Sequence, residues 1–383
     1  MKPSQENHVD DGQHNVKDFG ALGIGTDDSD AIQAAIDWQT ADGNRGVIFF
    51  PSGTYVITKP LTFDYVGPHS IIFRGVGRGS KLTGNFSGFI LDRSLTGNGD
   101  PGIDIIENLW FENSSTNAAA GCIRWNSCGA LTVRSCLING HTGFVTTDSL
   151  FDLLISQVHM SSNGSGSVLP QSVGLLVENL GGAGKIEASS IIGYGDGVRL
   201  GGTCQVTACR FELCGNGINV GTNVAGGGVG AGNVVVIGCG FEACDVGIWA
   251  RNAHKSLFMN CEVNGHAAAY YSGYGAGGSG PLSGTDADND KWSTYGFVTG
   301  NGTKNLWINC NVLGDTSTIS YNGAAILIAE DYGSYQGTAP ANTWINCHAA
   351  NGGVSFSGST TIWNISGMDN LCFERCTPDP LKD

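Results

Sequence analysis

Charged residues are scarce in this chain, and long apolar runs are missing. Only 14% of the 383 residues are charged, and 34 Asp and Glu outnumber 19 Lys and Arg, which gives a formal net charge of −15. A surface this acidic repels phosphate backbones and anionic lipids, so we expect neither nucleic acid nor membrane insertion. No apolar run of roughly 18 residues is available to span a bilayer. The opening MKPSQENHVDDGQHNV also lacks the apolar core of a secretory signal.

The cysteines lack the spacing that would indicate a chemical role. There are 13 of them, an odd number, and no two form a C-x-x-C pair. A zinc ribbon or a thioredoxin-like redox motif therefore has no support. The interpretation that fits is a set of reduced, buried cysteines that act as small hydrophobic side chains.

Two ligand-binding motifs are present only in part. Residues 273–278 (GYGAGG) satisfy G-x-G-x-x-G but open no helix, as a dinucleotide site requires. Asp286, Asp288 and Asp290 begin like an EF-hand loop, but Lys291 and Phe297 replace the glycine and glutamate of that loop. We therefore expect no cofactor and assign no metal ligand, while calcium bound in another way stays open as an alternative.

Glycine is abundant and follows no simple period. The chain has 60 glycines and is 41% hydrophobic, which is unlike a disordered chain, and the glycines keep no three-residue repeat, which excludes collagen. Glycine, asparagine, serine and threonine alternate with short β-branched runs. This pattern is typical of many short strands joined by tight turns.

One segment is repeated almost unchanged. VTACRFELCGNGINV (206–220) is followed by VIGCGFEACDVGIWA (236–250), with matching cysteines, phenylalanine, glutamate and glycine. The apolar-x-x-Cys pattern recurs at Val133–Cys136, Val206–Cys209, Val236–Cys239, Phe258–Cys261, Trp307–Cys310, Trp344–Cys347 and Phe373–Cys376. Two degenerate copies, Ile155 to Val158 and Ile186 to Ser189, fit the same frame. With them, the shorter intervals cluster at about 20–22 residues, and a unit of this length cannot bury its own apolar face and must stack on its neighbours. The repeat predicts an all-β solenoid, a parallel β-helix with a cysteine ladder at one corner.

The first part of the chain has a different pattern. Residues 15–57 indicate a strand, a turn, a helix and a strand, with Asp28 or Ser29 as the helix N-cap and Ile32 and Ile36 on its apolar face. A helix here would cover the open end of the solenoid. We predict an N-terminal segment with this capping helix over residues 1–45. The β-helix then follows over residues 46–383, with insertions at about 265–300 and 313–340.

The same residues carry a family resemblance. NVKDFGALGIGTDDSDAIQAAID, followed by GVIFFPSGTYVI and IIFRGVG, resembles the start of the pectate-lyase-like superfamily of right-handed parallel β-helices. That superfamily includes phage tailspikes and bacterial polysaccharide hydrolases and lyases. The resemblance implies a right-handed β-helix, polysaccharide binding with cleavage, and a homotrimer in the tailspike branch.

Two glutamates from the repeat are candidate catalytic residues. Residue alternation along a strand points Cys209 and Phe211 inward and Glu212 outward. The outward column then contains Glu112, Asn139, Ser161, Ile192, Glu212, Glu242, Asn264, Leu313 and Ala350. Glu212 and Glu242 are its acidic residues on adjacent turns, and a stacked carboxylate pair can supply an acid and a nucleophile. Asp245 is a third candidate, and pairing of the glutamates with Arg210 is the structural alternative.

The insertions contain the candidate substrate-binding residues. The aromatic and acidic side chains in question are Tyr270, Tyr271, Tyr274, Asp288, Trp292, Tyr295, Glu330 and Asp331. Aromatic rings suit the apolar faces of sugars, carboxylates suit their hydroxyls, and insertions on a rigid scaffold commonly carry binding sites. Packing of the tyrosines for stability, or at a trimer contact, is the alternative.

These observations predict a protein that binds and cleaves a bacterial surface or extracellular polysaccharide, in the manner of a phage tailspike depolymerase. Its expected location is the virion tail or outside the cell, as a homotrimer attached to a tail adaptor. A glycoside hydrolase that uses the carboxylate pair is favoured over a lyase that uses Arg210, Arg251 or Lys255 as its base. A secreted bacterial hydrolase or lyase and a non-catalytic receptor-binding or structural spike are the alternatives.

Overall fold

The computed structural model describes residues 12–41, 46–62, 70–94, 100–126, 128–147, 150–163, 169–178, 180–221, 231–242, 244, 246–250, 253–264, 295–299, 304–313, 326–329, 343–350, 363–366 and 372–374. The chain forms two compact units. The first consists of Met1–Asn163 with Asn179–Gly184, and the second of Gly164–Glu178 with Lys185–Asp383. The predicted boundary between residues 45 and 46 stays a prediction.

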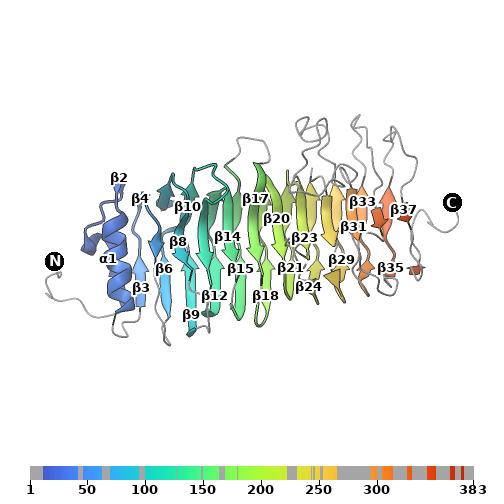
Figure 1. The fold of residues 1–383 in the computed structure, drawn as a ribbon, viewed down its shortest axis with the longest axis horizontal. Coiled ribbons are helices and arrows are strands. Elements are labelled where there is room, and N and C mark those ends of the chain that lie inside the picture. The colour runs from blue at the N-terminus through green and yellow to red at the C-terminus, as the bar shows by residue number, and fades with distance from the viewer. Residues whose placement is uncertain are drawn as a thin grey trace. The chain divides into compact units, whose positions relative to one another are not determined.

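The strands of the first unit form three parallel sheets, named A1, B1 and C1 (Figure 1). In spatial order, A1 contains β1 (Gln13–Asn15), β3 (Gly46–Phe49), β6 (Ile71–Arg74), β9 (Asp100–Glu107), β12 (Cys128–Arg134) and β15 (Asp152–Ser156). B1 contains β2 (Ile24–Asp27), β4 (Gly53–Ile57), β7 (Ser80–Gly84), β10 (Trp110–Asn113), β13 (Leu137–Gly140) and β16 (His159–Ser161). C1 contains β5 (Leu61–Thr62), β8 (Phe89–Arg93), β11 (Gly121–Trp125) and β14 (Thr142–Thr146).

The second unit repeats this plan in sheets A2, B2 and C2. A2 contains β18 (Gly184–Glu187), β21 (Cys204–Thr207), β25 (Val235–Ile237), β29 (Leu257–Met259), β32 (Leu306–Ile308), β35 (Thr343–Ile345) and β38 (Cys372–Glu374). B2 contains β19 (Ser190–Ile192), β22 (Arg210–Glu212), β26 (Gly240–Glu242), β30 (Glu262–Asn264), β33 (Asn311–Leu313) and β36 (His348–Ala350). C2 contains β17 (Leu169–Val177), β20 (Tyr194–Leu200), β23 (Asn216–Val220), β27 (Val246–Ala250), β31 (Tyr295–Thr299), β34 (Ile326–Ala329) and β37 (Trp363–Ser366).

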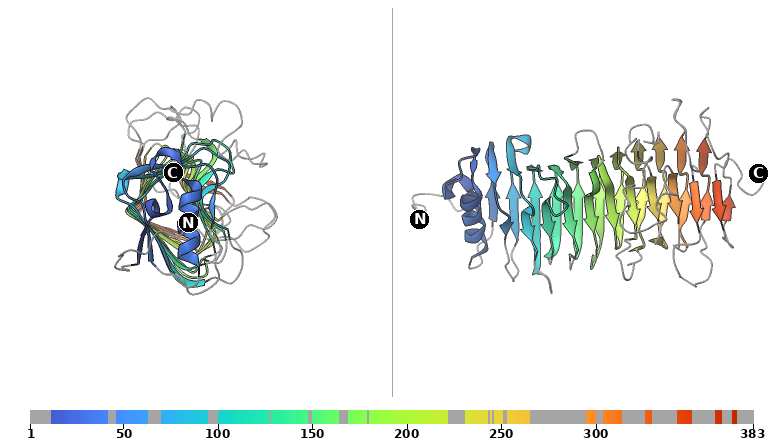
Figure 2. Two further views of the ribbon diagram at one scale, coloured as in Figure 1. Left: turned by 90° about the vertical axis from the view of Figure 1, so that its left-hand side faces the viewer. Right: turned by 45° about the horizontal axis from the view of Figure 1, so that its top comes forward.

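Successive turns visit the A, B and C sheets in the same order, and their strands pair in parallel with their counterparts one turn away (Figure 2). In the second unit, for example, β21, β22 and β23 make one turn and pair with β25, β26 and β27 of the next. The predicted right-handed parallel β-helix is therefore confirmed. The first turn differs, because among its described residues the chain passes from β2 through a helix to β3 without a C strand. In the second unit, β24 (Ala231–Gly232) and β28 (Ala253–His254) form an additional two-stranded parallel sheet.

The predicted N-terminal helix is α1 (Ser29–Thr40), which follows the 3₁₀ turn η1 (Val16–Phe19). Asp28 is its N-cap residue, and Ile32, Ala35 and Ile36 are fully buried. The helix packs against β3, β4 and β5 and so covers the starting end of the first unit (Figure 1). Within the described residues, no helix is long and apolar enough to cross a membrane.

Identical positions of successive turns lie over one another in the core of the second unit. Val206, Val236, Phe258, Trp307 and Trp344 are in register along A2 and are fully buried. The ring centroids of the last two are 4.4 Å apart, and the ring planes are nearly parallel, at 4°. This column contains the apolar positions that the sequence repeat predicts.

The predicted cysteine ladder occupies the corner between A2 and B2. The buried thiols there belong to Cys209, Cys239, Cys261, Cys310 and Cys347, none of which is in a disulfide. At the residue before each of the last three cysteines, the amide of Asn346 donates to Oδ1 of Asn309, and the amide of Asn309 donates to Oδ1 of Asn260, each over 3.1 Å. Because these thiols are buried and none of them is in a disulfide, the cysteines act as small apolar side chains.

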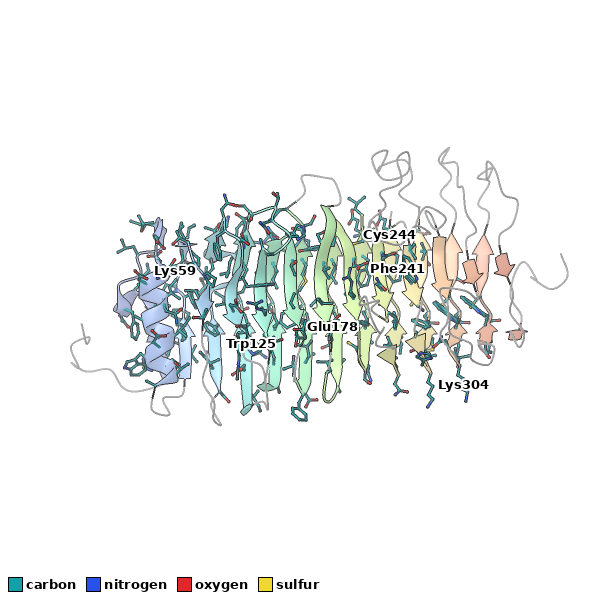
Figure 3. The ribbon with its side chains drawn as sticks, in the orientation of Figure 1. Lys59, Trp125, Glu178, Phe241, Cys244 and Lys304 are labelled. Carbon is teal, nitrogen blue, oxygen red and sulfur yellow. The ribbon has the colours of Figure 1, made fainter. Side chains whose placement is uncertain are left out.

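The repeated glycine has a packing reason. A Cβ atom on Gly217 would lie 2.3 Å from Cδ1 of Phe241 and 2.6 Å from the carbonyl oxygen of Gly247. The ring of Phe241 itself stacks on Phe211, with centroids 5.0 Å apart (Figure 3 labels Phe241). Glycine on C2 therefore leaves room for the ring stack that comes from B2.

The first unit contains a fully buried ion pair. Arg93 donates to Asp104 over 2.5 Å, and both side chains have no exposed surface. The carboxylate also accepts from the indole of Trp125 over 3.2 Å and from the backbone N–H of Ile71 over 3.0 Å (Figure 3 labels Trp125). These contacts join β6, β8, β9 and β11 across the core, because each partner lies on a different strand.

We expect Gly217→Ala to lower the free energy of unfolding by about 1–3 kcal/mol, because the added methyl group collides with Phe241. Gly240→Ala is the matched control, since a Cβ atom there meets nothing within 4 Å. Adding Phe241→Leu should recover part of the loss in a double-mutant cycle followed by denaturant unfolding. Equal losses at Gly217 and Gly240 would contradict this account.

Asp104→Asn should cost about 3–5 kcal/mol of unfolding free energy, because it leaves the Arg93 charge buried without its counter-charge. Asp30→Asn makes the same chemical change in an exposed pair with Lys59, where we expect no measurable loss. Chemical denaturation of both variants checks this. A small effect at Asp104 would show that the buried pair does not stabilise the unit.

Three of the buried thiols should be unreactive in the folded protein. Burial raises the pKa of Cys122, Cys136 and Cys204 to about 12, so almost no thiolate is present near neutral pH. Iodoacetamide labelling followed by peptide mapping should find these residues modified only after unfolding. Rapid modification in the folded state would contradict the burial of these thiols.

Candidate functional site

The two glutamates from the repeat lie side by side. Glu212 on β22 pairs in register with Glu242 on β26, and Asn264 on β30 continues the column. The carboxylate side chains are 30% and 55% exposed, respectively. The predicted outward stacking on adjacent turns is therefore confirmed, whereas their catalytic role stays a prediction.

An arginine lies between the two carboxylates. Arg210 starts the strand that Glu212 ends, and its guanidinium contacts Oε2 of Glu242 and lies 3.4 Å from Oε2 of Glu212. Hydrogen bonding to Glu242, followed by the charges of both glutamates, raises the pKa of Arg210. The cation offsets the repulsion between the carboxylates, which is the structural alternative that the sequence left open.

The long connections of the second unit all border sheet C2. Only two residues separate an A2 strand from the next B2 strand, as at Ala208–Cys209. By contrast, residues 265–294, 314–325 and 351–362 precede β31, β34 and β37, whereas 222–230 and 330–342 follow β23 and β34. Asn264, in the same column as the two glutamates, is the last residue before the longest of these connections. The glutamate column therefore lies at the edge of B2 that faces C2 along the chain.

A buried carboxylate on C2 organises a polar cluster. Asp196 on β20 is 3% exposed and accepts from Nδ2 of Asn216 over 2.7 Å and from Nε of Arg199 over 2.7 Å. The amide of Asn219 donates to the same carboxylate over 3.3 Å. These partners come from β20 and β23, because Asp196 and Arg199 are in register with Asn216 and Asn219.

Arg199 is the exposed member of this cluster. One-third of its side-chain surface is accessible, and the charges of Asp196 and then, more weakly, Glu178 raise its pKa. Glu178 follows β17 directly and is labelled in Figure 3. A guanidinium held at one edge by Asp196 has its other N–H groups available for a ligand rich in oxygen atoms.

The first unit has a related arrangement on C1. Arg124 on β11 donates to both oxygens of Asp92 on β8, over 2.7 and 2.5 Å. Its guanidinium carbon lies 4.9 Å from the ring centroid of Phe89. No group of three or more His, Cys, Asp or Glu among the residues described here is arranged to hold a metal ion.

Most of the predicted binding residues lie outside the described part of the chain. These are Asp245, Tyr270, Tyr271, Tyr274, Asp288, Trp292, Glu330 and Asp331. Tyr295 is the first residue of β31 and pairs with Val246, but its side chain is not among those described. Their roles stay predictions.

The sequence interpretation missed the Asp196 cluster. The signal was present in IIGYGDGVRL (191–200), which aligns with the glycine-rich end of the repeat but carries an aspartate in front of the glycine. In the next turn the corresponding residue is Asn216, a natural hydrogen-bond partner. Aligning the C2 strands turn by turn, as was done for the glutamate column, would have placed Asp196 beside Asn216 and indicated the cluster.

Comparison with known proteins gives short matches to enzymes that act on carbohydrates. The chain is 46% identical over 66 residues to glucan 1,3-beta-glucosidase of Cochliobolus carbonum, covering 14% of this chain and 8% of that protein. It is 55% identical over 92 residues to alginate lyase 7 of Azotobacter vinelandii, covering 22% and 10%. The chain thus matches about a tenth or less of the length of these relatives.

Solved structures share the fold. The tailspike protein of Acinetobacter baumannii phage AM24 aligns with a TM-score of 0.51 and 12% identity, over 95% of this chain and 53% of that one.

A family model gives the longest match in sequence. The model described as rhamnogalacturonase A/epimerase, pectate lyase-like matches residues 13–249, which include the Asp196 cluster, Glu212 and Glu242. The match confirms the predicted superfamily. Since it spans more than half of the chain, this protein belongs to the rhamnogalacturonase A/epimerase, pectate lyase-like family of β-helix proteins.

Proposed function

We propose that this protein binds a polysaccharide over sheet C2 and the adjoining edge of B2, and that it cleaves the bound chain. The observation that carries the proposal is the family match over residues 13–249, because the matched span includes the polar cluster of C2 and the stacked glutamates of B2. The long connections that border C2 support this choice of face, since binding sites are commonly placed in loops on a rigid scaffold.

We assign a role in binding or catalysis to the described polar side chains of this face. Arg199 and Asn219 donate hydrogen bonds to sugar oxygens, and Asp196 holds both donors in position from below. Arg210 contacts Glu242 more closely than Glu212. We therefore assign Glu242 as the ionised base or nucleophile and Glu212 as the proton donor to the leaving oxygen. Asp245 and the aromatic residues of the predicted insertions complete the proposed site.

The first test is incubation with a panel of bacterial capsular and extracellular polysaccharides. New reducing ends and ultraviolet absorbance of unsaturated sugars are followed together. We expect reducing ends without absorbance, because two carboxylates support hydrolysis. Absorbance that rises with the reducing ends would instead indicate β-elimination and would overturn the hydrolase assignment.

Conservative variants then test the carboxylates. Glu212→Gln and Glu242→Gln should each lower the rate by about 10²-fold or more, because each removes a proton-transfer or nucleophilic group. Glu112→Gln is the matched control, since Glu112 has the same column position on β10 in the first unit and pairs there with Lys81. Full activity in both B2 variants would exclude them as catalytic residues.

A binding-only spike is the second candidate, and the position of Arg210 between the two glutamates favours it. In this case the protein recognises a surface glycan without cleaving it, as a homotrimer attached to a virion tail adaptor. Clear retention by a polysaccharide without products, and a trimer in sedimentation velocity, would support it. A monomer that releases products would favour the remaining alternative, a secreted hydrolase or lyase.

A further inference from the structure

On the proposed binding face, carboxylates outnumber the arginines that pair with them. Arg210 is shared by Glu212 and Glu242, and Arg199 is bound by Asp196 with Glu178 nearby. Each of these arginines thus has two carboxylates around it. Both clusters carry net negative charge, although each contains a cation.

On the B and C sheets of the first unit, the cations are paired one to one with carboxylates, so they too have a partner within the chain. Arg124 is bound by both oxygens of Asp92, and Lys81 pairs with Glu112 over 2.8 Å. Sheet A1 has the opposite arrangement. There Glu107 is shared by Arg74 and Arg134, and their hydrogen bonds outweigh the effect of burial and lower its pKa. Among described strand residues, every arginine of sheets B and C already has a carboxylate partner in this chain.

The connections at the ends of the C2 strands add to this imbalance in sequence alone. The segments counted are 222–230, 251–252, 265–294, 300–303, 314–325, 330–342, 351–362 and 367–371. Their basic residues are Arg251 and Lys291, and their acidic residues are Asp286, Asp288, Asp290, Asp315, Glu330, Asp331 and Asp369. The remaining residues of the same connections add Glu178, Asp245, Lys255 and Lys304, so that nine acidic residues stand against four basic ones. The charge of these segments therefore has the same sign as the two arginine clusters and as the whole chain.

Recognition of a polyuronate needs cations that are free to pair with its carboxylates, because each like-charge contact weakens binding. The hydroxyl groups of a neutral sugar can instead donate to Asp and Glu and accept from asparagine and arginine N–H groups. Arg199 and Asn219 provide the N–H groups on C2, and Glu178, which follows β17 directly, provides a carboxylate beside Arg199.

We propose that the glycan bound by this protein is an uncharged polysaccharide rather than a polyuronate. The inference rests on the proposed function and adds the substrate class. It separates this chain from the relative named alginate lyase 7, since alginate is a polyuronate.

The test uses two forms of one polymer. Polyuronates such as alginate and polygalacturonate are compared with their carboxyl-reduced forms, beside neutral glucans, galactans and mannans, by affinity electrophoresis of the full chain. Each gel is run with calcium and with a chelator, and at low and high salt. We expect retention by at least one neutral or carboxyl-reduced polymer, with little dependence on salt or calcium, and at least about tenfold weaker binding of the polyuronates.

A charge-reversal variant tests the cause. Glu242→Lys frees Arg210 from its closer partner and adds a cation, so polyuronate binding should rise by about tenfold or more at low salt. Asp30→Lys is the matched control, because it makes the same charge change on α1, where Asp30 is exposed beside Lys59. Equal gains in both variants would show a general charge effect and would overturn the assignment to this face.

Two other results have distinct meanings. Wild-type protein that prefers the polyuronate to its reduced form, with binding that weakens in salt or requires calcium, would overturn the neutral-glycan inference and leave polysaccharide binding intact. Absence of retention by every polymer and by bacterial cells would overturn the proposed function, and the inference with it.

Discussion

The parallel, in-register stacking of successive turns is the constraint on which the other features of this protein depend. Each side chain lies over its counterpart at the strand spacing of about 4.8 Å, so a residue must be compatible with a near copy of itself above and below. In the core this favours flat rings and small thiols, as in the column that ends with Trp307 and Trp344. It also explains the glycine at Gly217, where the Phe241 ring takes the space of a side chain.

On the outer faces the same stacking brings like charges together. Glu212 and Glu242 are neighbours because the fold repeats, and Arg210 offsets the resulting repulsion. Asp196 meets the amide of Asn216 instead of a second carboxylate. Stacking therefore determines which polar side chains are neighbours on a β-helix, whether or not a ligand binds there. This is why a pair of stacked carboxylates alone does not establish a catalytic centre.

The repeat made much of the fold predictable. Because apolar-x-x-Cys recurs from turn to turn, the sequence aligns Val206, Val236 and Phe258 although insertions lengthen some intervals. The outward glutamate column then follows from strand alternation. The helix over Ser29–Thr40 follows from its own apolar period. The position of the Arg210 side chain was harder to predict from the sequence, because a guanidinium can reach a carboxylate on its own turn or on the next. The Asp196 cluster was missed because C2 strands are separated by connections of variable length, which hide their register.

The two ends of the B2 strands differ in the connections that they carry, and this difference supports the proposed site. The corner between A2 and B2 is closed by two-residue turns and a cysteine ladder, whereas the ends of C2 receive the long connections. In a scaffold of this kind, connections can lengthen only where they do not interrupt the strand pairing, and in the second unit such connections lie at the ends of the C2 strands. The proposed binding face therefore consists of the rigid polar surface of C2 and the edge of B2 beside it.

A crystal structure of the Glu242→Gln variant with a bound oligosaccharide tests this placement most directly. The account predicts sugar hydroxyls within hydrogen-bonding distance of Arg199 and Asn219, with the glycan chain crossing C2 toward Glu212. An oligosaccharide bound along A2, or over the helix α1, would contradict it.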